Sequence, residues 1–285
     1  MANTKITLMG DSVLDNFYWL SIMRHDLKYE LEQLGYKVDN FAVDESQLNN
    51  VIHGIAPRDV YQITRHYSYP CAEDGKVHPI ELLVNSGSNI CVLSIGGNDL
   101  RVNLWKLTLG TDHFVNSVLT QQFSDNLDHV LTNIKLVTSK IILILVYIPY
   151  IGPGSRYAMF SQYRYQVSEK LLLFYRMTAR KHNIPLLDLS KTFDYNDRNH
   201  YGSTEIEPSN LSNKCIADCI NYIYRNYRGY SVYYAPNCNS DNIQVDSIYL
   251  DSEACNLMQS GYNQDLQSQS SPNTITSIPV KCIIQ

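Results

Sequence analysis

Five short, mainly apolar segments alternate with longer segments of helical pattern over the first 228 residues. The apolar segments are 6–9, 36–43, 90–95, 140–148 and 185–189, and the longer helical patterns lie at 13–34, 114–137, 163–182 and 211–227. Strands separated by helices at this spacing predict a parallel sheet with helices on both faces. In such folds ligands bind at the carboxyl ends of the strands, so we look for chemistry there.

The character of the chain changes after residue 228. We predict one domain over residues 1–228 and an extension over 229–258, in which 230–234 and 243–250 have the pattern of short strands. Residues 259–285 are rich in Ser and Gln at first and are expected to form a flexible tail.

Composition excludes several classes of protein. The formal net charge is −5 and no basic run stands out, so we expect no nucleic-acid partner. The seven cysteines lack paired spacing, which is typical of free thiols in a reducing compartment. We find no signal-peptide pattern and no apolar run near the ~20 residues that span a bilayer. The prediction is a cytosolic protein, and the histidines show no spacing that indicates a metal site.

Polar residues follow the first, third and fifth apolar segments. "GDS" follows the first and contains Ser12, "IGGND" continues the third and contains Asn98, and "YGSTEIEPSN" lies in a loop after the fifth. A serine, an amide and an acidic loop along one sheet edge suit acyl transfer. That chemistry needs a nucleophile, donors for a developing oxyanion and a base.

These motifs resemble the GDSL/SGNH hydrolases, whose four blocks carry Ser, Gly, Asn and His. The resemblance covers residues 4–228 and implies a three-layer α/β/α sandwich with a parallel, flavodoxin-like five-stranded sheet. It further implies hydrolysis of ester or thioester bonds without a metal or other cofactor. Carried over residue by residue, Ser12 would be the nucleophile, and its backbone N–H and the Asn98 amide would hold the oxyanion.

Two positions depart from the family pattern. The glycine of the second block is matched by Asp44 and Glu45, where the Glu45 backbone N–H would have to serve as the oxyanion donor. The final Asp-x-x-His is matched by Thr204 and Glu207. A carboxylate is a weaker base than an imidazole unless burial raises its pKa.

Three readings of this departure stay open. Glu207 acts as the base, oriented by Thr204 or Glu205. Alternatively, His200 supplies the base from the same loop. In the third reading the site is inactive, and the domain is an SGNH-fold module that binds a lipid, a sugar or a protein.

The sequence ends in Cys282-Ile283-Ile284-Gln285, which matches a C-a-a-X prenylation box. We expect one prenyl chain on Cys282 to attach the protein weakly to the cytosolic face of a membrane. Because prenylation is eukaryotic, this pattern indicates a eukaryotic protein or a microbial or viral effector that works inside a host. The Asn- and Tyr-rich composition favours the second.

The sequence as a whole predicts a serine esterase or lipase of the GDSL/SGNH class. The substrate of this enzyme would be a small-molecule or lipid ester. The alternative function is that of an inactive binding module tethered to a membrane by a prenylated tail.

Overall fold

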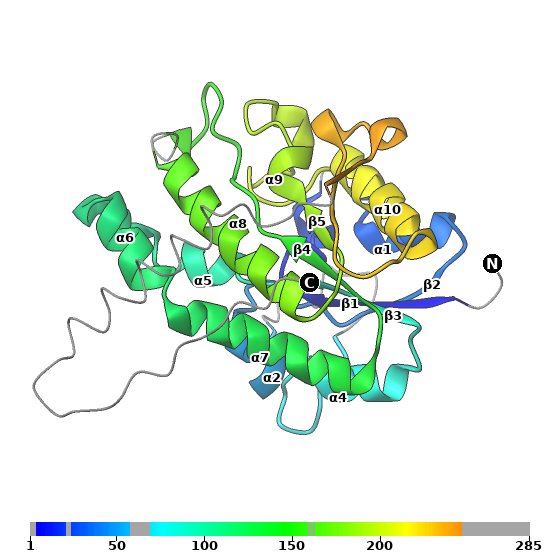
Figure 1. Ribbon diagram of the computed structural model, residues 1–285. Coiled ribbons are helices and arrows are strands. Elements are labelled where there is room, and N and C mark those ends of the chain that lie inside the picture. Colours follow the sequence, from blue (N-terminus) through cyan, green and yellow to red (C-terminus); the bar gives the residue numbers. More distant parts are fainter. Residues whose placement is uncertain (1–3, 21–23, 58–68, 159–160, 162, 247–285) are drawn as a thin grey trace, which may run out of the picture. The chain divides into compact units, whose positions relative to one another are not determined.

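The computed structural model describes residues 4–20, 24–57, 69–158, 161 and 163–246 (Figure 1). Contacts divide the chain into Met1–Ser247 and Ile248–Gln285, and only the first unit is described below. The predicted tail 259–285 and Cys282 lie outside the described residues, so their predictions stay untested.

A seven-stranded sheet forms the centre of the fold, in the order β2-β1-β3-β4-β5-β6-β7. The strands are β1 (Lys5–Gly10), β2 (Lys37–Asn40), β3 (Ile90–Ser94), β4 (Ile141–Leu145), β5 (Leu186–Asp188), β6 (Val232–Tyr234) and β7 (Gln244–Asp246). All neighbours are parallel except β6 and β7, which are antiparallel. The five predicted strands and their flavodoxin-like order are confirmed.

The predicted strand number of five is wrong, because the extension adds two strands to the edge beyond β5. Val232 pairs with Leu186, and Tyr233 pairs with Val245 of the edge strand. The short strands predicted within 230–234 and 243–250 are confirmed as β6 and β7 in the residues that the structure describes, although β7 has no buried residue. The sheet therefore continues past the boundary predicted at residue 228.

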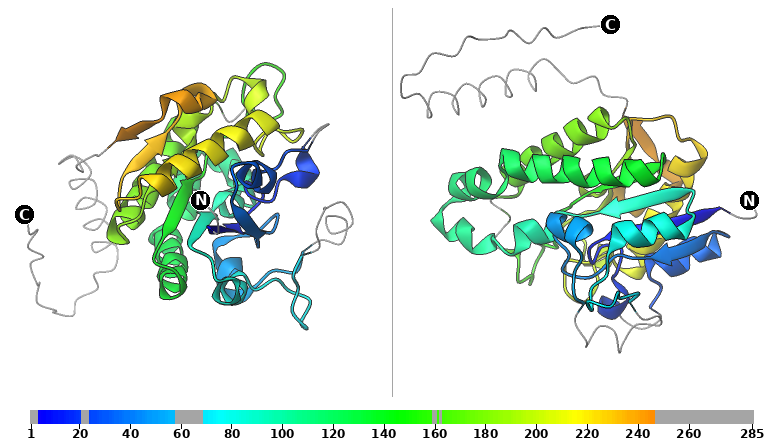
Figure 2. Two further views of the ribbon diagram at one scale, coloured as in Figure 1. Left: turned by 90° about the vertical axis from the view of Figure 1, so that its right-hand side faces the viewer. Right: turned by 90° about the horizontal axis from the view of Figure 1, so that it is seen from below.

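Helices cover both faces of the sheet (Figure 2). Side chains of successive strand residues alternate between the faces: Ile142 and Ile144 pack in one core and Leu143 and Leu145 in the other. The first core includes α1 (Leu27–Gln33), α9 (Leu189–Thr192) and α10 (Asn210–Arg225). The second includes α2 (Leu48–His53), α4 (Pro79–Ser86), α5 (Gly97–Arg101), α6 (Thr111–Val118), α7 (Gln121–Val137) and α8 (Arg164–Lys181). Short 3₁₀ helices are η1 (Phe17–Trp19), η2 (Leu104–Leu109), η4 (Arg198–His200), η5 (Pro236–Cys238) and η6 (Ser240–Asn242).

The helix predicted over 13–34 is mostly absent, and this prediction is wrong for its first half. Residues 11–15 form a turn in which the Asp11 carboxyl accepts from the Val13 N–H at 3.2 Å. The helix α1 starts only after Asp26, whose side chain accepts from the Tyr29 N–H at 2.8 Å as an N-cap. The turn leaves Ser12 directly at the end of β1.

Gly10 permits that turn. Its φ is +123°, and a Cβ there would lie 1.7 Å from the Ser94 carbonyl oxygen of β3. Only glycine fits such a backbone against a neighbouring strand. The close approach of β1 and β3 brings the segments that carry Ser12 and Asn98 together.

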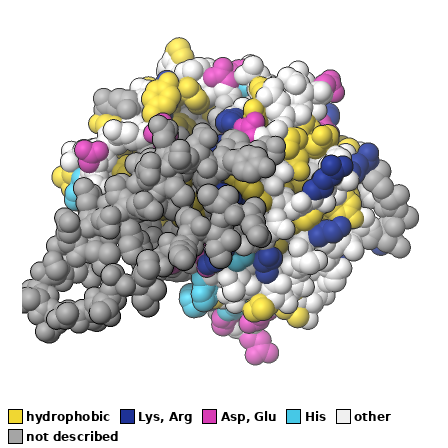
Figure 3. Space-filling model, viewed as in Figure 1, with side chains coloured by type: hydrophobic (Ala, Val, Ile, Leu, Met, Phe, Trp, Pro, Cys, Tyr) yellow, Lys and Arg dark blue, Asp and Glu magenta, His cyan; other side chains and the backbone are white. Residues whose placement is uncertain are grey.

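Figure 3 shows one face of the molecule. On the described part of this face, basic and acidic side chains both occur among apolar and uncharged ones. Of the helices in the described ranges, none combines the length and the apolar character that a membrane crossing requires.

Candidate active site

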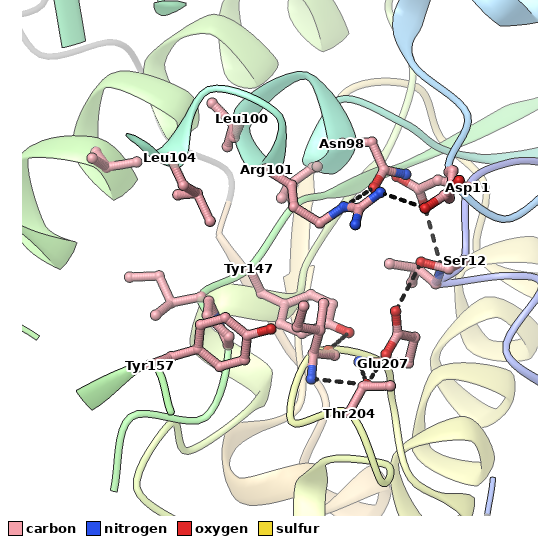
Figure 4. Close-up of a pocket in the computed structure, with 18 of the residues that line it drawn as sticks. Asp11, Ser12, Asn98, Leu100, Arg101, Leu104, Tyr147, Tyr157, Thr204 and Glu207 are labelled. Carbon is pink, nitrogen blue, oxygen red and sulfur yellow. Dashed lines mark hydrogen bonds and ion pairs between the residues drawn. The ribbon is translucent and has the colours of Figure 1, made fainter. Parts of the chain in front are cut away.

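The carboxyl ends of β1, β3 and β5 bring the predicted residues to one edge of the sheet. Ser12 follows β1, Asn98 lies in α5 just after β3, and the loop with Thr204 and Glu207 follows β5 (Figure 4). Ser12, Asn98 and Glu207 are each only 6 % exposed. The sheet edge predicted from the motifs therefore carries a cluster of buried polar side chains.

Ser12 and Glu207 face each other across this cluster. The Ser12 hydroxyl donates to Glu207 Oε1 at 3.2 Å, and the Thr204 hydroxyl donates to Glu207 Oε2 (Figure 4). One carboxyl group thus stands between two hydroxyls. The sequence prediction matched Glu207 to the family's histidine and Thr204 to its aspartate, and in the structure these two side chains contact each other.

The surroundings favour the neutral form of Glu207. Burial raises its pKa to about 7, and the nearby Asp44 carboxyl adds to the rise. The pKa of Asp44 is itself raised by burial and then by Glu45. A carboxyl group whose pKa lies near neutrality can accept and return a proton at physiological pH.

The turn that carries Glu207 is fixed from several sides. The Gly202 N–H donates to the Glu207 carbonyl at 2.7 Å, and Arg198 Nη1 donates to the Gly202 carbonyl at 2.6 Å. Glu205 has a φ of +69° and sends its carboxyl away from Ser12, where Oε2 accepts from Ser155 Oγ at 3.1 Å. Of the two predicted orienting residues, within the described part of the chain, only Thr204 forms a hydrogen bond to the Glu207 carboxyl.

His200 lies in a different environment. Its Nδ1 accepts from the Asp194 N–H at 2.8 Å, its Nε2 faces Asp197 at 3.9 Å, and the ring also contacts the Cys238 thiol. All of these contacts point away from Ser12, and His200 does not line the cavity described below. The structure therefore brings Glu207, and not His200, to the serine.

The two predicted oxyanion donors of Ser12 and Asn98 each keep an N–H available. Within the described residues, no hydrogen bond engages the Ser12 N–H. Asn98 Nδ2 donates one hydrogen to the Ser46 carbonyl at 3.0 Å, which leaves its second hydrogen for the site. The predicted donor Glu45 differs, because its backbone N–H hydrogen-bonds to the Asp44 carboxyl.

Glu45, which the sequence prediction matched to a glycine of the family, has a backbone conformation that favours glycine. Its φ is +69°, in the left-handed region that favours glycine. Its carboxyl turns to Arg101, whose Nη2 donates to Oε1 at 3.0 Å. The acidic side chain is thereby held beside a guanidinium group.

Asp11 supports the cluster from the sheet. It accepts from Ser94 Oγ at 3.1 Å and is buried, and this burial raises its pKa to about 7. Asp99 binds the Leu48 N–H at 3.0 Å, and burial raises its pKa to about 6. Both carboxyls tie neighbouring loops to the strand ends.

A cavity of about 390 Å³ opens beside Ser12 and Glu207. Its polar end consists of the catalytic candidates, and its wall away from them is apolar (Figure 4). The apolar wall comes from α5, η2, α6, the end of β4 and α8, as Leu100, Leu104, Leu107, Phe114, Val146, Tyr163 and Val167.

Sequence reasoning missed two groups at this site, Arg101 and the apolar wall. Arg101 lies three residues after Asn98, a spacing that places both on one helix face and could have signalled a contact. The partnership of Arg101 with Glu45 spans 56 residues and has no local signal.

Comparison with known proteins gives the family and the fold of this chain. The family model of GDSL-like lipase/acylhydrolase proteins matches residues 6–222. The comparison with curated proteins returned no match.

Three solved structures share the fold at low identity. The psychrotrophic esterase EstA from Pseudoalteromonas sp. is 12 % identical, with a TM-score of 0.50 over 79 % of this chain and 98 % of EstA. The lipase Lip_vut3 from a goat rumen metagenome is 11 % identical, with a TM-score of 0.52 over 77 % and 97 %. An extracellular lipase from Streptomyces rimosus is 15 % identical, with a TM-score of 0.50 over 74 % and 95 %. This chain belongs to the GDSL-like lipase/acylhydrolase family, whose members are hydrolases that act on esters.

Proposed function

We propose that the protein is a serine esterase in which Glu207 replaces the usual histidine as general base. The observation that carries the proposal is the 3.2 Å hydrogen bond from Ser12 Oγ to a buried carboxyl whose pKa is about 7. At neutral pH a substantial fraction of Glu207 is ionised and can accept the serine proton.

The reaction then runs in two steps. Ser12 Oγ attacks the ester carbonyl carbon while its proton passes to Glu207 Oε1. The Ser12 N–H and Asn98 Nδ2 donate to the oxyanion. Glu207 returns the proton to the leaving alcohol, and the acyl group stays on Ser12. Water then attacks the acyl-serine and gives its proton to Glu207. The bond from the acyl carbon to Ser12 Oγ breaks, the carboxylic acid leaves, and Glu207 returns the proton to Ser12 Oγ. The Thr204 hydroxyl holds Oε2 in place throughout.

A serine-directed probe tests this proposal. A fluorophosphonate should label the wild-type protein at Ser12, and wild-type protein should hydrolyse p-nitrophenyl esters. Ser12→Ala should lose both properties while it keeps its circular dichroism spectrum. A wild-type protein that neither labels nor hydrolyses between pH 5 and 9 would instead favour the predicted binding module.

The acyl part of the substrate is an apolar chain in this proposal. Leu104, Leu107 and Phe114 form an apolar part of a cavity that Arg156 and Arg164 also line, and each methylene buried against this apolar part gains about 0.8 kcal/mol. A cavity of about 390 Å³ has room for far more than an acetyl group.

Activity should therefore rise with acyl length. Along a series of p-nitrophenyl esters, kcat/KM should rise about three- to fourfold per added methylene until the cavity is filled. Leu107→Trp fills the wall and should shift the optimum to shorter chains with little change for acetate. Leu109→Trp is the matched control, because Leu109 lies on the same 3₁₀ helix and is 59 % exposed. An equal loss at every length in Leu107→Trp would contradict an acyl site.

We keep membrane attachment through Cys282 as a separate proposal, supported by the sequence motif alone. Mass spectrometry of the protein from eukaryotic cells tests it, and an unmodified Cys282 would refute it.

A further inference from the structure

Asn98 needs a fixed amide orientation to act as an oxyanion donor, since its oxygen would repel the developing charge. The structure fixes both ends of this amide. Nδ2 donates to the Ser46 carbonyl at 3.0 Å, and Oδ1 accepts from Arg101 Nε at 2.8 Å (Figure 4). A flipped amide would place NH₂ against a guanidinium N–H and oxygen against a carbonyl, and both pairs are unfavourable.

The same guanidinium group also binds Glu45. Arg101 Nη2 donates to Glu45 Oε1 at 3.0 Å. The Arg101 side chain therefore connects Glu45 to the Asn98 amide. The two hydrogen bonds use different nitrogens of the planar guanidinium group, so the rotation of this group is restricted. The side chain of Arg101 is 41 % exposed, and these two contacts hold it over the site.

We infer that Arg101 is a positioning residue for the oxyanion hole, and that Glu45, at the family's glycine position, holds Arg101 in place. The guanidinium also polarises the Asn98 carbonyl, which makes the amide hydrogens better donors. The inference rests on the proposed function, because an oxyanion forms only if the protein attacks an ester.

Arg101→Met removes the guanidinium and keeps a similar stem. It should lower kcat about tenfold with KM changed less than about threefold, since the contact matters in the transition state. Asn98→Ala should lower kcat about 10²–10³-fold. At a pH well above 7, where the effect of Arg101 on the pKa of Glu207 no longer changes the charge of the base, the double variant should match Asn98→Ala alone, because Arg101 acts through Asn98. Lys106→Met, a nearby cation without contact to Asn98, should keep wild-type kcat and serves as the control.

Glu45→Gly tests whether Glu45 holds Arg101 in place. It relieves the left-handed backbone at this position and so should not lower the melting temperature, yet it should lower kcat about two- to fivefold because Arg101 loses its second anchor. A purely structural role of Glu45 predicts the opposite, a lower melting temperature with unchanged kcat.

The exchange of the Asn98 Nδ2 hydrogens with solvent can be measured without any catalytic reaction. Measured by NMR and assigned with Asn98→Ala, it should be several times faster in Arg101→Met than in wild type or Lys106→Met. Equal exchange rates, or additive losses of kcat in the double variant, would overturn the inference. An inert wild-type protein with slow Asn98 exchange would refute the esterase proposal while the positioning by Arg101 stands.

Discussion

Glu207→Gln is expected to lower kcat for ester hydrolysis by about 10²–10⁴-fold, the usual contribution of a general base. Gln keeps the size of the side chain and an acceptor for Ser12 Oγ, but it cannot take a proton. The fall in kcat should therefore occur with little change in KM. Steady-state kinetics on the best p-nitrophenyl ester measures it.

The matched control addresses the other candidate base. In His200→Asn, the Asn oxygen can replace Nδ1 as acceptor for the Asp194 N–H, so the fold around η4 is preserved. This variant should keep turnover close to that of wild type. A large loss in His200→Asn together with an active Glu207→Gln would reverse the assignment of the base.

Glu207→Gln should also stabilise the folded protein above neutral pH. Burial raises the pKa of Glu207 from its ordinary value of 4.5 to about 7, so the folded state disfavours the carboxylate. The contribution of Glu207 to stability is fully present below pH 4.5 and is lost as pH rises through 7, because the unfolded chain ionises first. Gln lacks this penalty, which is about 3 kcal/mol at pH 8.

Thermal melts of both proteins from pH 5 to 8 measure this effect. The melting temperature of Glu207→Gln should exceed that of wild type by about 5 °C at pH 8, and the difference should shrink toward pH 5. The raised pKa of Asp11 is common to both proteins and cancels in the difference. A variant that melts below wild type at every pH would show that burial of the carboxyl is not costly.

Much of this site could be predicted from sequence because it depends on strand ends. Strands buried on both faces have continuous apolar runs, and the motifs with Ser12 and Asn98 follow β1 and β3 directly. The correspondence of Thr204 and Glu207 with the family's last block also placed the carboxyl at the serine.

Other features depend on tertiary contacts that leave no local pattern. At the start of the helix predicted over 13–34, residues 11–15 form a turn in which the Asp11 carboxyl binds the Val13 N–H, and the 3₁₀ helix η1 follows it. The strand pattern of 243–250 was visible in the sequence, but its pairing with β6 at the edge of the main sheet depends on tertiary contacts. The sequence showed Glu45 as a departure from glycine. Its ion pair with Arg101 depends on the order of the sheet, in which β1 lies between β2 and β3.

The most direct test of Glu207 as the base is the pH dependence of Ser12 labelling by a fluorophosphonate. The rate constant for wild type should rise with pH and reach half its maximum near pH 7, where burial places the pKa of Glu207. Glu207→Gln should label slowly and without that step. A Glu207→Gln protein that labels at the wild-type rate, with the same rise near pH 7, would contradict the assignment.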